Sequence, residues 1–217
     1  MPAVIAITSE KGGVGKSTLA VHLAGALSER GLHVTLVDED GRVGSSIGWA
    51  QRSLKRSPEQ GHVGLGFEVL EPDEVRPRLL RDLDALVIDT EGRPKRKELR
   101  DLSERADTIL LPSGVSTLEL ESTLTLAEFL TSEGGARRKL KVILTRVPPT
   151  SGAGERARED LREAGLTVCN TLVRQYAAYL RAAELGVLCR DLPAREDLGG
   201  RAAQAWQDIL SLSREVL

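Results

Sequence analysis

The sequence feature that most constrains the fold is a glycine-rich loop that joins an apolar run to a helix-like segment. The apolar run covers residues 4–7, the helix-like segment covers residues 19–27, and the loop reads Ser9-Glu10-Lys11-Gly12-Gly13-Val14-Gly15-Lys16-Ser17-Thr18. Glycines let such a loop turn its N–H groups inward, and the helix N-terminus adds roughly half a positive charge. We therefore predict that residues 11–18 bind a nucleotide, with Lys16 on the β/γ-phosphates and Ser17 on Mg²⁺.

The loop departs from the general phosphate-binding motif in one informative way. That motif has a glycine five residues before Gly15, where this chain has Glu10. Residues 11–17 match instead the narrower form K-G-G-x-G-K-[ST], the deviant Walker A loop. In this feature the chain resembles the ParA/MinD family of ATPases, and Lys11 is the specific signal. The alternative is a glycine-rich turn before an ordinary helix.

Length and composition are those of one globular domain. The 217 residues suit a single α/β domain, residues 1–217, and carry a formal net charge of −2. No apolar run approaches the roughly 20 residues of a membrane span, and residues 1–3 lead straight into the first strand, so we expect a cytoplasmic protein. Cys169 and Cys189 form no C-x-x-C pair, and His22, His33 and His62 have no partners at metal-ligand spacing, so we expect them to be structural.

Apolar runs of four to six residues alternate with segments of helical period along the whole chain. This pattern predicts a doubly wound, mostly parallel sheet flanked by helices. The expected strands are 4–9, 34–38, 67–70, 85–89, 108–112, 141–146 and 168–172. The expected helices are 16–30, 45–57, 73–83, 95–105, 118–132, 154–164, 176–185 and 201–216. Ligands of such sheets bind at the carboxyl ends of the strands.

Carboxylates follow two of these strands. Asp89 ends an apolar strand and is predicted to be the Walker B aspartate, which orients the waters around Mg²⁺, although an acidic turn would give the same pattern. Gly92 completes a D-x-x-G turn whose N–H can bind the γ-phosphate. The resemblance implies that Asp40 positions the attacking water and the metal shell. Gly41-Arg42 replaces the family's Pro-Gln, and Glu91-Gly92 replaces two prolines, so both loops are less stiff.

The resemblance also implies where the adenine base of ATP is bound. Family members commonly have an asparagine after the sixth strand, where this chain has Thr145-Arg146, as in short plasmid-type partition ATPases. Pro193, in Asp191-Leu192-Pro193, corresponds to a second loop that contacts the base. A hydroxyl discriminates between bases less well than an amide does.

Further partners are implied by the resemblance to ParA partition ATPases. In that family the lysine corresponding to Lys11 reaches the phosphates of a partner subunit in an ATP-dependent homodimer, and supplies catalytic charge there. The dimer binds double-stranded DNA without sequence preference on the nucleoid, and a ParB-like, centromere-binding protein stimulates hydrolysis. Arg174 and Arg201 resemble the DNA-contacting arginines, although solvated surface charges are equally compatible, as are the basic runs 93–97 and 137–141.

Two other functions remain open. A MinD-like membrane-cycling ATPase needs a basic, amphipathic C-terminal helix, and residues 211–217 contain one arginine and no aromatic residue. A metabolic ATP-dependent ligase of the same fold needs a pocket for an organic substrate, which the sequence does not reveal. An iron–sulfur role is disfavoured, because both cysteines lie late in the chain.

Overall fold

A sheet of seven strands forms the centre of the computed structural model, which describes residues 1–41, 43–56, 64–197 and 199–217. The strand order is β3-β2-β4-β1-β5-β6-β7, and every neighbouring pair is parallel. The strands are β1 Ala3–Ile7, β2 Val34–Asp38, β3 Glu68–Leu70, β4 Ala85–Asp89, β5 Thr108–Ser113, β6 Leu140–Val147 and β7 Val168–Arg174. The predicted α/β class and the doubly wound parallel sheet are therefore confirmed.

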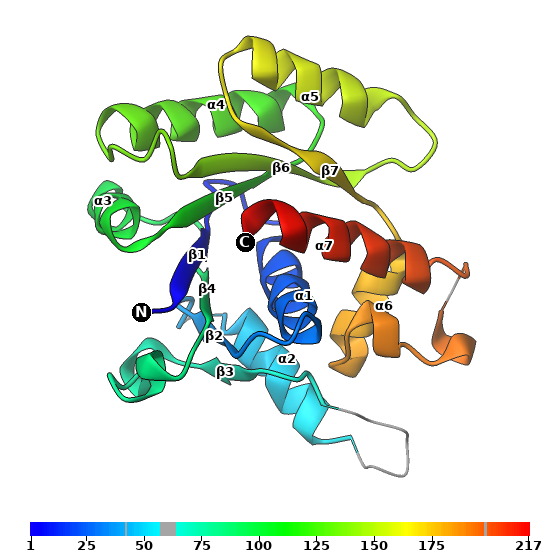
Figure 1. Ribbon diagram of the computed structural model, residues 1–217. Coiled ribbons are helices and arrows are strands. Elements are labelled where there is room, and N and C mark those ends of the chain that lie inside the picture. The colour runs from blue at the N-terminus through cyan, green and yellow to red at the C-terminus, as the bar shows by residue number, and fades with distance from the viewer. Residues whose placement is uncertain (42, 57–63, 198) are drawn as a thin grey trace.

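Helices cover both faces of the sheet (Figure 1). They are α1 Lys16–Glu29, α2 Ser45–Leu54, α3 Arg96–Arg105, α4 Thr117–Ser132, α5 Ala153–Glu163, α6 Ala177–Leu185 and α7 Ala202–Val216. One hydrophobic core lies between the sheet and α1, α2, α6 and α7, and the other lies under α3, α4 and α5. Successive residues of β1 serve both cores, because Ile5 and Ile7 face the first and Ala6 faces the second.

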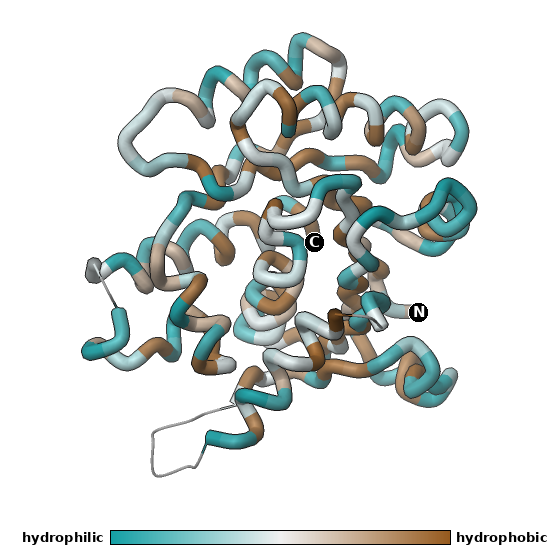
Figure 2. Tube along the Cα trace, turned by 180° about the vertical axis from the view of Figure 1, so that it is seen from behind, coloured by the Kyte–Doolittle hydropathy of each residue, from teal (hydrophilic) through white to brown (hydrophobic). Residues whose placement is uncertain are grey.

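The hydrophobic pattern along the backbone agrees with this layering. Viewed from behind, hydrophobic residues are concentrated in the central strands, and much of the outer rim is hydrophilic (Figure 2). Within the described ranges, no helix is long and apolar enough to cross a membrane.

One predicted helix, 73–83, is wrong. The structure has two short 3₁₀ turns there, Pro72–Glu74 and Leu79–Arg81. Pro77 lies between them, and a proline inside a helix removes a backbone donor and disfavours the helical conformation of the residue before it. The predicted helix 45–57 ends at Leu54, and its last residue, Ser57, lies outside the described residues, as do Arg42 and His62.

Strand register brings two aspartates together at one edge of the sheet. Asp89 at the end of β4 pairs in register with Asp38 at the end of β2 on one side and with Ile7 at the end of β1 on the other. The glycine-rich loop follows β1 directly. The loop and both aspartates therefore lie side by side at the carboxyl ends of the strands.

Candidate nucleotide-binding site

The glycine-rich loop has the backbone geometry that its sequence predicts. Gly13 has φ 79° and Gly15 has φ 86°, a left-handed conformation that other residues adopt only with strain. Gly15 is also the N-cap of α1, and no side chain caps this helix end. The first turn of α1 carries no acidic residue, so its N–H groups and its dipole suit an anion.

A cavity of about 580 Å³ opens in front of the loop and brings most of the predicted phosphate-site residues together. Asp40 and Gly92 from the two acidic loops lie on its wall, together with Trp49 and Arg52 of α2. From the loop itself it is lined by Lys11, Gly12, Gly13, Gly15, Lys16, Ser17 and Thr18. Val14 is buried instead, with a side chain that packs inside the fold. The loop residues predicted to surround the phosphates therefore share one cavity with the predicted water-positioning carboxylate.

Lys16 is paired with Asp89, the predicted Walker B aspartate. Its Nζ lies 2.8 Å from Asp89 Oδ1 and also donates to the Thr90 carbonyl. The Asp89 side chain is fully buried and the Lys16 side chain is 10% exposed. The pair therefore keeps the lysine at the cavity with its charge neutralised.

Asp38 and Ser46 form a buried polar network behind the cavity. Asp38 Oδ2 accepts hydrogen bonds from the backbone N–H groups of Ser46, at 2.8 Å, and Ile47, at 3.0 Å, and so caps the start of α2. Burial raises the pKa of the Asp38 carboxyl, and the nearby charge of Asp89 raises it further. Ser46 Oγ donates to Asp89 Oδ2 at 2.8 Å. Ser46 was not predicted from the sequence, where its only signal is its place near the start of an expected helix.

Asp40 and Gly92 are placed differently from Asp89, at the cavity surface. The Asp40 carboxylate accepts from the Val43 N–H at 3.2 Å, and its carbonyl accepts from the Gly44 N–H at 2.7 Å. Gly92 is exposed, and a Cβ at this position would meet no atom within 4 Å. Each loop therefore offers a group to the cavity while leaving room for a ligand.

The donor set suits Mg²⁺ bound together with a nucleotide. Ser17 and Asp40 line the cavity and offer hard oxygen ligands, and buried Asp89 pairs with Lys16, which lines the same cavity. Within the described residues there is no group of three or more His, Cys, Asp or Glu side chains that could hold a metal ion. Mg²⁺ commonly keeps several waters and takes few protein ligands beside substrate phosphates, so this sparse arrangement fits it.

A second cavity, of about 270 Å³, adjoins the first and shares Gly13, Gly15 and Thr18 with it. Thr145 and Arg146, predicted to contact the base, line this cavity, but both are bonded to the loop. Thr145 Oγ1 donates to the Val14 carbonyl at 2.7 Å, and Arg146 Nη1 donates to the Gly13 carbonyl.

The remaining wall of the second cavity is mostly apolar, and most of it comes from β7, α6 and α7, which the sequence did not connect with the site. It consists of Leu19, Val173, Arg174, Gln175, Tyr176, Tyr179, Leu180, Ala183 and Ile209. Tyr176 and Tyr179, three residues apart after β7, are the sequence signal that could have indicated this wall. Pro193, the third predicted base contact, is not among the described residues that line either cavity.

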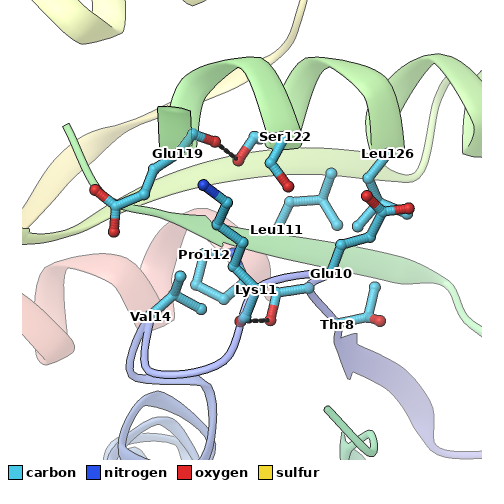
Figure 3. Close-up of a pocket in the computed structure, with 11 residues that line it drawn as sticks. Thr8, Glu10, Lys11, Val14, Leu111, Pro112, Glu119, Ser122 and Leu126 are labelled. Atoms are coloured by element: carbon cyan, nitrogen blue, oxygen red, sulfur yellow. Dashed lines mark hydrogen bonds between the residues drawn. The ribbon is translucent and has the colours of Figure 1, made fainter. Parts of the chain in front are cut away.

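The Lys11 side chain extends toward α4 (Figure 3). Its Nζ donates to the Leu118 carbonyl in the first turn of that helix at 2.8 Å. The same turn carries Glu119, which lines the small pocket through which the Lys11 side chain passes. The second lysine of the motif is thus held by a single backbone oxygen, whereas Lys16 is held by a buried carboxylate.

The two arginines predicted to contact DNA are both close to α7, one through an ion pair and one as its N-cap residue. Arg174 ends β7, and its guanidinium forms an ion pair with Asp208 of α7. The Arg174 side chain is 39% exposed. Arg201 is the exposed N-cap residue of α7, and the structure shows no ion pair for it with the described residues. Arg201 therefore offers a free positive charge, and Arg174 offers one that is largely neutralised.

Comparison with known proteins agrees with the geometry. The model of the CobQ/CobB/MinD/ParA nucleotide binding domain matches residues 5–188. Maintenance of carboxysome distribution protein A of Gloeobacter kilaueensis is 35% identical over 193 residues, which cover 86% of this chain and 83% of that protein. Protein ParA of Rhizobium radiobacter is 29% identical, over 86% of this chain and 84% of that protein.

A solved structure shows the same fold. The ATP complex of a McdA variant from Cyanothece superposes with a TM-score of 0.70 at 16% identity, and the match covers 100% of this chain and 97% of that chain. The deviant glycine-rich loop, the parallel sheet that carries it and the family match over residues 5–188 lead to one conclusion. The chain belongs to the CobQ/CobB/MinD/ParA family of nucleotide-binding proteins, as its resemblance to ParA and MinD predicts.

Proposed function

We propose that this protein is a Mg²⁺-dependent ATPase that forms an ATP-bound homodimer and uses DNA as a surface on which to position a cargo. The observation that carries the proposal is the different state of the two motif lysines. Lys16 is held inside its own site by buried Asp89, whereas Lys11 is held by one carbonyl at the surface. A lysine held this lightly can turn to a second subunit.

The geometry suggests a sequence of events at the phosphates. An incoming triphosphate competes with Asp89 for Lys16, because its charges are larger and lie in front of an uncapped helix end. Ser17, Asp40 and Asp89 are the residues that would hold Mg²⁺, and the ion would supply positive charge beside the β/γ-phosphates when bound. Asp40 then orients the attacking water, and the Gly92 N–H senses the γ-phosphate. Lys11 of the partner subunit stabilises the charge that develops during transfer.

The second cavity is the natural place for the base. It adjoins the phosphate cavity at Gly13 and Thr18, and its wall includes Tyr176 and Tyr179. The Thr145 hydroxyl is already bonded to the loop, so base recognition depends on shape and on other groups. This supports an adenine pocket of low polar selectivity.

DNA contact and cargo are the finer part of the proposal. Arg201, exposed at the start of α7, would contact DNA phosphates, and dimer symmetry would double the contact. A ParB-like or other centromere-binding partner would link the dimer to a plasmid or chromosome. A protein compartment is the second candidate cargo, because the relative at 35% identity is a carboxysome distribution protein.

The structure gives less support to the membrane and ligase alternatives. The apolar face of α7, including Trp206, Ile209 and Leu212, is packed in the core with α1 and β7. A helix buried in this way does not present that face to a bilayer. We assign the second cavity to the base, so this cavity gives no support to a separate site for an organic substrate.

One binding series tests the proposal. Random duplex DNA is titrated with the protein in the presence of ATP, ADP or no nucleotide, and oligomeric state is followed by light scattering. We expect dimers and DNA binding with ATP only, with binding that weakens as salt rises and weakens further in Arg201→Ala. Binding that does not depend on ATP would contradict the DNA function. Hydrolysis of ATP without dimers or DNA binding would favour a metabolic ligase of the same fold.

A further inference from the structure

Arg146 has a backbone conformation that its residue type disfavours. It has φ 53°, and the only other described non-glycine residue with positive φ is Arg93. The register between β6 and β7 shifts in the interval that contains it, between Leu144 and Val147. An irregularity of this kind re-aims a side chain. In this protein it directs Arg146 toward the phosphate-binding loop.

The Arg146 guanidinium bonds to two acceptors at once. Nη1 donates to the Gly13 carbonyl, and Nη2 donates to Glu119 Oε1 at 3.1 Å. Because a peptide bond is trans and planar, holding the Gly13 oxygen on one side keeps the Val14 N–H on the opposite side. A loop that binds phosphate needs its N–H groups in a fixed orientation, so this contact bears directly on the loop's function.

Glu119 is itself fixed in place. It is the third residue of α4 and forms a capping box with Ser116. Its carboxylate lies against Gly114, where a Cβ would come within 2.2 Å of Oε2. Its side chain is only 16% exposed. A glycine therefore makes the space in which the carboxylate receives Arg146.

We propose that Glu119 and Arg146 are a positioning pair that holds the Gly13–Val14 peptide in the orientation required for nucleotide binding. Arg146 acts through the loop, in place of the direct base contact that the sequence implied. An arginine suits this role because its planar fork serves two acceptors, which a lysine cannot do with fixed geometry. The proposal rests on the proposed function, since only a nucleotide-binding protein can show the effect.

Three variants separate positioning from folding. Arg146→Asn removes the guanidinium but keeps a residue type that accepts the left-handed backbone. Arg146→Lys keeps the charge, and Glu119→Gln keeps a side chain that can cap α4. The Kd of a fluorescent ATP analogue with Mg²⁺ and the thermal unfolding midpoint without nucleotide are measured for each variant and for the Glu119→Gln/Arg146→Asn double variant.

We expect Arg146→Asn and Glu119→Gln each to raise the Kd about tenfold, the loss expected for one charge-assisted hydrogen bond. The Kd of the double variant should be no higher than that of Arg146→Asn, because both changes break the same interaction. Arg146→Lys should fall between Arg146→Asn and the wild type. The matched control is Arg100→Gln, because Arg100 is 49% exposed, against 48% for Arg146, and pairs with Glu133 far from the loop. Its Kd should stay within twofold of the wild type.

Three results would overturn the positioning pair while the wild type binds nucleotide. The first is a Kd of Arg146→Asn within twofold of the wild-type Kd. The second is a double variant whose fold-increase in Kd equals the product of the two single increases. The third is a lowered unfolding midpoint of Arg146→Asn or Glu119→Gln with an unchanged Kd. A wild-type protein that does not bind the analogue would instead overturn the proposed function, and the pair with it.

Discussion

Protonation of His22 should destabilise this fold. The ring is fully buried, in contact with the rings of Trp49 and Tyr179. Nε2 accepts from the Cys189 N–H at 3.2 Å, so Nδ1 carries the hydrogen and donates to the Thr18 carbonyl at 2.8 Å. A second proton would take the acceptor away from Cys189 and place a charge in the core. Burial accordingly lowers the pKa of His22 from 6.5 to about 4.

The magnitude follows from the difference between the two pKa values. The unfolded chain takes up a proton near pH 6.5, whereas the folded protein does so only near pH 4. The free energy of unfolding therefore falls as pH is lowered through this window, by up to about 1.4 kcal/mol per unit and about 3 kcal/mol in all. Burial raises the pKa of Tyr179 and of Cys189, so these two neighbours stay neutral throughout.

Urea unfolding between pH 4.5 and 7.5 tests this account. Carboxylates also titrate in the window, so the informative quantity is the difference between the wild type and His22→Gln, which cannot take up the proton. We expect this difference to shrink as pH falls, because only the wild type loses stability through His22. His33→Gln, at an exposed position, should follow the wild-type curve. Parallel curves for the wild type and His22→Gln would refute the reasoning.

Four further outcomes are expected. Lys16→Ala should abolish nucleotide binding in calorimetry and lower thermal stability, because it leaves buried Asp89 unpaired, and adding Asp89→Asn should restore stability but not binding. Lys11→Ala should keep nucleotide affinity but lose dimers formed with a slowly hydrolysed ATP analogue in light scattering, and normal dimers would mean that Lys11 does not act in trans. Ser46→Ala should lower the free energy of unfolding by about 2 kcal/mol, because the Ser46 hydroxyl donates to the Asp89 carboxylate. Ser103→Ala should cost only about 1 kcal/mol, because that hydroxyl donates to a neutral carbonyl, and equal losses would contradict this account. Gly186→Ala should lower the free energy of unfolding, measured in urea, by about 2 kcal/mol or more, since φ is 69° and a Cβ would lie 2.5 Å from the Ser53 backbone nitrogen. A loss below about 0.5 kcal/mol would count against that contact.

The sequence predicted those elements well whose bounds depend only on the residues within one segment. β2 and β4 begin and end where the apolar runs do, and the phosphate-binding loop has its left-handed glycines at Gly13 and Gly15. The helix predicted at 73–83 failed because helical spacing was followed past Pro77. Strand ends differ by up to two residues, since hydrogen bonds to neighbouring strands decide where a strand stops.

The site was predictable in its loop and less so in its surroundings. Thr145 and Arg146 were expected to face the base, but their donors are bonded to carbonyls of the loop more than a hundred positions earlier in the chain. The role of Ser46 depends on a partner, Asp89, that only the sheet brings near. Contacts of this kind depend on the register between distant segments, and no spacing within one segment encodes them.

The capping of α2 by Asp38 has a consequence for how members of this family are sorted into active and inactive proteins. Because the carboxylate holds two buried backbone N–H groups, a descendant that lost hydrolysis would still be selected to retain it for folding. An aspartate at this position is then no marker of catalysis in a newly read genome. In the proposed mechanism Asp40 and Lys11 are the better markers of catalysis, because both line the cavity and neither belongs to the hydrophobic cores.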